Sequence, residues 1–264
     1  MMSTARASER NRKWIVPALG SILPLGLLVF WQILGDLGYL SPLLFPTPLS
    51  IAEAFVSLAA SGELLEHLQI SLARALLGFG LGGGLGLSVG ILVGMFRVTE
   101  KALDPSIQMI RMIPSLALAP LFVLWFGIGE ESKILLIAKG AFFPLYINAF
   151  LGVRNVDRKL FDVARVLGFS RLSQTFRLVL PAALPHILLG IRLSLGVAWL
   201  GLVVAELMAS TSGIGYLMSD ARQFAHTPVV FVGILIFAAF GKAADSLVRW
   251  MERRWLRWRD TYSG

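Results

Sequence analysis

The sequence predicts an all-α integral membrane protein with about six transmembrane helices and both termini in the cytoplasm. Composition is the first reason: 56% of the 264 residues are hydrophobic and only 15% are charged, whereas a soluble domain contains about 25% charged residues. The second reason is a series of apolar runs of about 20 residues, the length that an α-helix needs to cross a bilayer. The third is the uneven distribution of lysine and arginine among the segments that connect these runs.

Six segments of the chain are apolar enough to be spans. We place them at residues 15–34, 70–95, 105–126, 133–151, 186–208 and 229–249. The first is interpreted as an uncleaved span and not as a signal peptide, because no A-x-A-like cleavage site follows it. The predicted domains are a basic cytoplasmic tail, a transmembrane domain and a second basic cytoplasmic tail, at residues 1–14, 15–250 and 251–264.

Positive charge gathers on one side of the membrane in this arrangement. With a cytoplasmic N-terminus, the outer segments contain only Lys133 and Arg222, and the other cations outside the spans are cytoplasmic. A bias of lysine and arginine sets the orientation of membrane proteins, so both termini are expected inside. The net charge of +8 then follows from topology. We expect contact with membrane lipid and no nucleic-acid partner.

The first outer segment is long, at about residues 35–68, and contains a rigid FPTP turn. The stretch SIAEAFVSLAASGELLEHL, residues 50–68, follows this turn and has helical periodicity. It predicts a helix on the outer surface. Its acidic residues suit either a solvated connector or a contact with a partner, and the sequence leaves both open.

Glycine recurs every four residues in the second span. A spacing of four places small residues on one helix face, where another backbone can approach closely. The sequence predicts a face buried in protein, which serves either ordinary close packing or a moving bundle. The glycines of this face are Gly78, Gly82, Gly86, Gly90 and Gly94.

Ionisable residues at or near membrane depth in the predicted spans include Arg111, Lys139, Arg192 and Glu206. Charged residues at this depth are costly and usually face the bundle interior or an aqueous path. Arg111 lies beside Pro114 and Pro120, which are expected to interrupt the helix and free backbone carbonyls. Arg111, Pro114 and Glu206 are therefore candidates for a translocation pathway. The alternatives are an ion pair between Arg111 and Glu206, and snorkelling of the other two cations to the interface.

The sequence contains no catalytic or metal-binding pattern. It has no cysteine and three scattered histidines, so we expect no metal site. Gly241-Lys242 is followed by Ala243 and lacks the upstream glycine of a Walker A loop. The chain is therefore expected not to hydrolyse ATP itself. We expect no catalytic residue and no cofactor in this chain.

The stretch FDVARVLGFSRLSQTFRLVLP, residues 161–181, interrupts the apolar sequence with basic residues. It follows the fourth predicted span, which makes it cytoplasmic. Residues 162–167 predict a short helix, and Gly168 permits the left-handed turn that ends it. Ser170 is a candidate N-cap for a second helix, and Pro181 is expected to close the unit. The sequence thus predicts a rigid helix-turn-helix on the cytoplasmic side.

This stretch resembles the EAA loop of permeases from ABC importers, whose pattern is EAA-x3-G-x9-I-x-LP. Every spacing of that pattern is kept, at Asp162-Val163-Ala164, Gly168, Leu178 and Leu180-Pro181. The departures are Asp for Glu, Val for the first Ala, and Leu for Ile. We refer to residues 155–182 as the coupling loop. By resemblance, the residues that contact the ATPase are Asp162, Ala164, Gly168, Leu178, Leu180 and Pro181.

The resemblance extends over nearly the whole chain. IQMIRMIPSLALAPLFVLWFGIGEESK, FFPLYINAFLGVRNVD and LPHILLGIRLSLGVAWLGLVVAELMASTSGIGYL are similar to permeases of the nitrate, sulfonate and taurine importers, and most similar to those for aliphatic sulfonates. This implies a type I importer fold, a homodimer in the bacterial inner membrane and a role in sulfur assimilation. Two separate ATPase subunits would bind ATP and Mg, and an extracytoplasmic substrate-binding protein would deliver the sulfonate.

Three functional alternatives stay open. The first is the same permease role for taurine, nitrate or another small anion. The second is a self-contained secondary transporter, which needs coupling groups within the spans, where Glu206 is the obvious acid. The third is a membrane enzyme, which the missing catalytic pattern disfavours. Copurification with an ATPase subunit would separate the permease from the other two.

Overall fold

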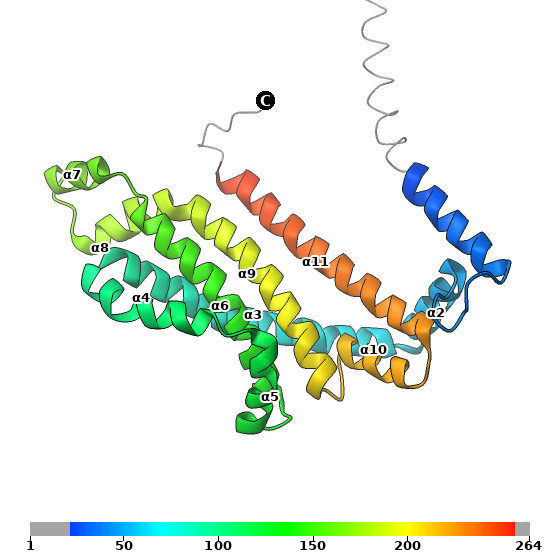
Figure 1. The fold of residues 1–264 in the computed structure, drawn as a ribbon. Coiled ribbons are helices and arrows are strands. Elements are labelled where there is room, and N and C mark those ends of the chain that lie inside the picture. Colours follow the sequence, from blue (N-terminus) through cyan, green and yellow to red (C-terminus); the bar gives the residue numbers. More distant parts are fainter. Residues whose placement is uncertain (1–21, 257–264) are drawn as a thin grey trace, which may run out of the picture. The chain divides into compact units, whose positions relative to one another are not determined.

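The structure is a computed structural model that describes residues 22–256, and all the regular elements in this range are helices (Figure 1). The predicted N-terminal tail, the start of the first predicted span and the last part of the C-terminal tail lie outside the described residues. The chain divides into two compact units. One comprises the residues up to Glu63 together with Met218–Ile234, and the other comprises Leu64–Leu217 together with the residues from Leu235 onward.

The first unit contains the helix Ile22–Asp36, helix α2 (Pro48–Ser61) and the start of α11 (Thr227–Trp255). Thr47 caps α2 through its hydroxyl, which accepts a bond from Ser50 N, and Pro48 occupies the first turn, where its missing N–H costs nothing. Gly62 then ends α2 in the left-handed conformation, with φ of 81°. The single helix predicted over residues 50–68 is therefore wrong, because Gly62 separates α2 from α3.

The second unit contains helices α3 (Glu63–Met95), α4 (Arg97–Arg111), α5 (Ser115–Phe126), α6 (Glu130–Arg154) and α9 (Leu180–Ala209). Between α6 and α9 lie α7 (Arg158–Val166), α8 (Arg171–Gln174) and the π-helix η1 (Thr175–Val179). Helix α10 (Ile214–Gln223) follows α9. Helices α6 and α9 make an extensive contact within this unit.

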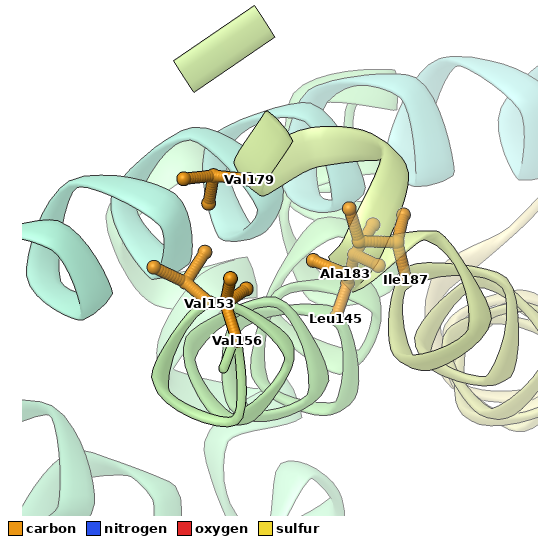
Figure 2. Close-up of a cluster of buried hydrophobic side chains, with 6 residues drawn as sticks. All are labelled: Leu145, Val153, Val156, Val179, Ala183 and Ile187. Carbon is orange, nitrogen blue, oxygen red and sulfur yellow. The ribbon is translucent and has the colours of Figure 1, made fainter. Parts of the chain in front are cut away.

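The α6–α9 pair is antiparallel and closely packed. Gly152 of α6 lies against Ala183 near the start of α9, whereas Gly140 lies against Val197 further along. Where the pair meets η1, a cluster of buried side chains forms a core (Figure 2). The cluster consists of Leu145, Val153, Val156, Val179, Ala183 and Ile187. This core holds the base of the coupling loop.

Four described helices are long and apolar enough to cross a membrane: Glu63–Met95, Glu130–Arg154, Thr175–Met208 and Thr227–Trp255. They coincide with four of the predicted spans. The span predicted at residues 105–126 is broken, as expected at Pro114, because α4 and α5 meet at an angle of 96°. Proline disfavours the helical conformation in the residue before it, and Pro114 lies at this bend. Pro120 lies inside α5 and does not interrupt it.

Candidate functional site

The coupling loop forms the predicted helix-turn-helix. Helix α7 ends at a left-handed turn in which Gly168 has φ of 69°. The hydroxyl of Ser170 accepts a hydrogen bond of 3.2 Å from Ser173 N, which is the contact of an N-cap. A side chain at Gly168 would be strained by this backbone conformation. The turn therefore depends on glycine at this position.

Pro181 does not close the loop, contrary to the prediction. The second helix continues from α8 through the π-helix η1 into α9, and Pro181 lies in the first turn of α9. In a regular α-helix a proline ring clashes with the carbonyl four residues earlier, here that of Arg177. The wider turn of η1, in which Leu180 N donates to Thr175 O, lies at this point. The second helix of the coupling loop is thus continuous with the span predicted at residues 186–208.

The structure divides the six motif residues of the loop into two groups. Ala164 is buried, and Leu178 and Leu180 pack against the core cluster at the base of the loop. Asp162, Gly168 and Pro181 are exposed. Four apolar side chains near them are also exposed, which is unusual for the end of a polar loop. They are Val163, Val166, Leu167 and Phe176, and Val166 is 88% exposed.

The five glycines of the four-residue repeat lie on the side of α3 that faces α6. A Cβ on Gly82 would meet the backbone of Ala138, and a Cβ on Gly90 would lie 2.5 Å from Tyr146 O. Two glycines off the repeat differ, since a Cβ on Gly80 or Gly84 would meet nothing within 4 Å. The two helices run parallel, because later glycines of α3 meet later residues of α6. Backbone contact between them requires glycine on this face.

Gly90→Ala is expected to destabilise this packing by about 1–3 kcal/mol, the range observed for overpacking a tight contact. The added Cβ would lie 2.5 Å from Tyr146 O and 2.8 Å from Ala149 Cβ. The control is Gly84→Ala, which adds a methyl group in open space and a better helix former. The measurement is the midpoint of thermal unfolding of the purified variants in detergent. Equal midpoints for the two variants would contradict the contact.

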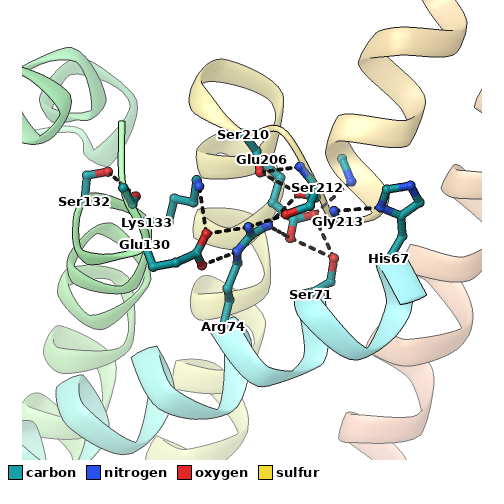
Figure 3. Close-up of polar contacts among 12 residues, drawn as sticks. His67, Ser71, Arg74, Glu130, Ser132, Lys133, Glu206, Ser210, Ser212 and Gly213 are labelled. Atoms are coloured by element: carbon teal, nitrogen blue, oxygen red, sulfur yellow. Dashed lines mark hydrogen bonds and ion pairs between the residues drawn. The ribbon is translucent and has the colours of Figure 1, made fainter. Parts of the chain in front are cut away.

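A network of charges, buried except at Glu130, joins α3, α6 and α9 (Figure 3). Its centre is Arg74, which is 2% exposed. The Arg74 guanidinium donates to both oxygens of Glu130, at 2.6 and 2.7 Å, and to Glu206 Oε1 at 2.8 Å. Lys133 Nζ lies 3.0 Å from Glu130. Two cations thus face two carboxylates, so each of the buried charges of Arg74, Lys133 and Glu206 has an opposite charge beside it.

The loop after α9 completes this network. Glu206 is 1% exposed and accepts hydrogen bonds from Ser71 Oγ and from Gly215 N, at 2.7 and 2.8 Å. Gly213 has φ of 102°, and a Cβ there would collide with the Glu206 carboxylate. The ion pair considered between Arg111 and Glu206 is wrong, because Glu206 pairs with Arg74.

Sequence reasoning missed Arg74 although a signal was present. Arg74 lies four residues before Gly78 and continues the glycine repeat toward the start of α3. An arginine on the face of a helix that otherwise carries glycines for close packing must be buried. A buried arginine requires carboxylate partners, and the sequence places acids at the start of α6 and near the end of α9.

A cleft of about 530 Å³ lies beside the bend between α4 and α5. Arg111 and Pro114 line it, as the sequence places them together, whereas Glu206 is not among its lining residues. Lys139 of α6 also lines the cleft and donates to Ile113 O at 2.6 Å and to Ser115 Oγ at 3.1 Å. The structure therefore gives Lys139 two oxygen partners, one in the turn after α4 and one at the start of α5.

Arg192 likewise has a partner inside the unit. Its Nε lies 2.7 Å from Asp245 Oδ1, and Arg249 lies 2.7 Å from the other oxygen of the same carboxylate. This pair joins α9 to α11. Within residues 22–256, no group of three or more His, Asp or Glu side chains is placed to hold a metal ion.

Comparisons with known proteins show similarity to the membrane subunits of transport systems. Residues 82–257 match the family described as binding-protein-dependent transport system inner membrane component. The chain is 60% identical over 245 residues to the putative aliphatic sulfonates transport permease protein SsuC of Bacillus subtilis (strain 168), covering 93% of this chain and 89% of that protein. Identity to the protein of the same description from Escherichia coli (strain K12) is 48% over 251 residues, 95% of each chain.

A further relative is described as a permease for a different substrate. The chain is 38% identical over 260 residues to the taurine transport system permease protein TauC of Escherichia coli (strain K12), covering 95% of this chain and 94% of that protein. The similarity to all three proteins covers nearly the full length of the chain.

Proposed function

Because the chain belongs to the family of inner membrane components of binding-protein-dependent transport systems, we propose that it is the permease subunit of an ATP-driven importer for aliphatic sulfonates. The observation that carries the permease role is the coupling loop, a helix-turn-helix with buried Ala164 and a left-handed Gly168. The substrate class is supported by the full-length similarity to two proteins described as aliphatic sulfonate permeases.

The coupling loop is suited to transmit motion from a separate ATPase. Its exposed apolar side chains, Val163, Val166, Leu167 and Phe176, offer a surface that a partner subunit would bury. Its base is fixed to the helices by Leu178, which packs on the core cluster. A displacement of η1 would be transmitted to α9, because the helix continues from η1 into α9 without a break.

The proposal includes a topology and an assembly. We place six spans in the bacterial inner membrane with both termini in the cytoplasm, supported by the lysine and arginine bias of the sequence. Two copies of the chain would form the pathway, two ATPase subunits would bind ATP and Mg on the cytoplasmic side, and a substrate-binding protein would deliver the sulfonate outside. Arg111 and Pro114 are proposed to line the pathway, and Glu206 is proposed to hold the helices together.

The experiment is uptake of labelled alkanesulfonate into proteoliposomes that contain the chain, its ATPase and its binding protein. Uptake should require ATP on the side of the vesicle where the ATPase lies, and it should disappear when the binding protein is omitted. Taurine and nitrate serve as competitors, since one relative is described as a taurine permease. Strong competition by either would move the substrate to that anion. Uptake without ATP would reject the importer in favour of a secondary transporter.

A further inference from the structure

The cleft beside the α4–α5 bend has the size and lining of a small-molecule site. Its volume of about 530 Å³ falls within the range of roughly 300–1,000 Å³ that ligand pockets occupy. Four helices contribute to it: the end of α4 with the turn that follows, the start of α5, the middle of α6, and α9. All of these elements belong to the second unit. The cleft is thus built into one compact body.

One part of the cleft is positively charged. Arg111 and Lys139 line it, and none of the described lining residues is a carboxylate that would balance them. An ammonium carries three N–H donors, and the bonds from Lys139 to Ile113 O and Ser115 Oγ account for two of them. The third donor and the exposed Arg111 guanidinium remain available to an anion.

The other part of the cleft is apolar. Ile147 of α6 contributes to it together with Leu193 and Val197 of α9, and Leu193 is exposed. Phe143 also lines the cleft, and the centroid of its ring is 5.7 Å from Lys139 Nζ. Exposed branched side chains next to a cation suit a ligand that has a charged head and a hydrocarbon tail.

We propose that this cleft is a transient binding site for the alkanesulfonate in the permease itself, an inference that rests on the proposed function. The sulfonate oxygens accept hydrogen bonds from Lys139 and Arg111, and the alkyl chain lies against Leu193, Val197 and Ile147. A sulfonate is anionic at all physiological pH values and has three acceptor oxygens. It can therefore engage both cations at once, through charge-assisted hydrogen bonds.

The same lining selects against taurine. The second carbon of taurine carries an ammonium group, which would lie beside two cations or against the apolar wall. Neither place offers a carboxylate among the described lining residues, and an unpaired buried charge is costly. Discrimination here comes from a missing partner and from like-charge repulsion, not from a tighter fit of the alkyl chain.

The first test removes the cation. In the reconstituted complex with saturating loaded binding protein, Lys139→Gln should lower uptake of methanesulfonate and octanesulfonate alike by about tenfold, as expected for losing one charge-assisted hydrogen bond. Lys139→Arg keeps the charge and should keep most of the uptake. Lys101→Gln removes an exposed cation outside the cleft and is the matched control. Equal uptake by Lys139→Gln and the control would overturn the site.

The second test uses the apolar wall and does not depend on the first variant assembling. Leu193→Ala should lower uptake of octanesulfonate by about threefold and leave methanesulfonate unchanged, because only a long chain reaches the wall. Leu200→Ala removes an exposed leucine of α9 that does not line the cleft, and it should affect neither substrate. Equal effects of Leu193→Ala on both chain lengths would overturn the site.

The two proposals fail in different ways. If the wild-type complex transports no sulfonate with ATP, the proposed function is rejected. If the wild type transports alkanesulfonates but neither variant changes the dependence on charge or chain length, the importer stands and the cleft is not a substrate site.

Discussion

Arg74→Ala should leave little folded protein, with a loss of about 3–5 kcal/mol, the cost of removing one partner from a buried ion pair. Arg74 bonds Glu130 and Glu206 as well as the carbonyl and hydroxyl of Ser212. Its removal leaves the Glu206 carboxylate without its cation while 1% exposed. The measurement is the fraction of monodisperse protein after detergent extraction, together with the midpoint of thermal unfolding.

The control for this variant is Arg222→Ala, which removes an exposed arginine and should change the midpoint little. A double-mutant cycle isolates the pair. Glu206→Gln added to Arg74→Ala removes the uncompensated charge, so the double variant should be less destabilised than the sum of the two single variants. Strict additivity would contradict the ion pair between Arg74 and Glu206.

Gly168→Val should uncouple ATP hydrolysis from transport. Gly168 has φ of 69°, and a β-branched residue in that conformation is strained, at a cost of about 1–3 kcal/mol. The turn between α7 and α8 would open, and the exposed apolar side chains of the loop would lose their mutual placement. The measurement is the number of ATP molecules hydrolysed per sulfonate imported in proteoliposomes, which should rise strongly while uptake falls.

Gly168→Asn is the matched variant, because asparagine tolerates the left-handed conformation better than other residues with a side chain. It should retain much of the coupling that the valine variant loses. Uptake by Gly168→Val at the wild-type level, with an unchanged ratio of ATP to substrate, would contradict the role of the turn.

The long helices were predictable because their signal is local. Runs of apolar residues identify α3, α6, α9 and α11 whatever the rest of the chain does, although polar ends such as the start of α3 at Glu63 extend beyond the apolar part. The turn at Gly168 was also predictable, since glycine followed by a capping serine carries its own geometry. In each case neighbouring residues decide the structure.

The bend and the π-helix show where local reasoning fails. Pro114 and Pro120 both looked like interruptions, but only Pro114 lies at the 96° bend. Pro181 looked like a terminator, but the helix absorbs it through a wider turn. A proline forbids one hydrogen bond, and whether the helix then bends, widens or continues depends on packing that the sequence does not display.

The charged network was not predictable from spacing alone. Arg74 bonds residues that are 56 and 132 positions away, so the partners become neighbours only when α3, α6 and α9 pack together. The cleft also forms only when distant parts of the chain pack together. Lys139 and Arg111 were each visible as charges in apolar sequence, but their common cavity depends on the bend after α4.

The glycine face of α3 has a consequence for how its position along α6 is defined. A repeat of four residues presents the same smooth surface again after a shift of about 6 Å, slightly more than one turn, and shifts of about one turn between packed helices are known. Glycines alone therefore leave several registers nearly equivalent. Arg74 stands where the next glycine of the series would be, and its bonds to Glu130 and Glu206 are satisfied in a single register. The ion pairs give a unique alignment to a surface that has none of its own.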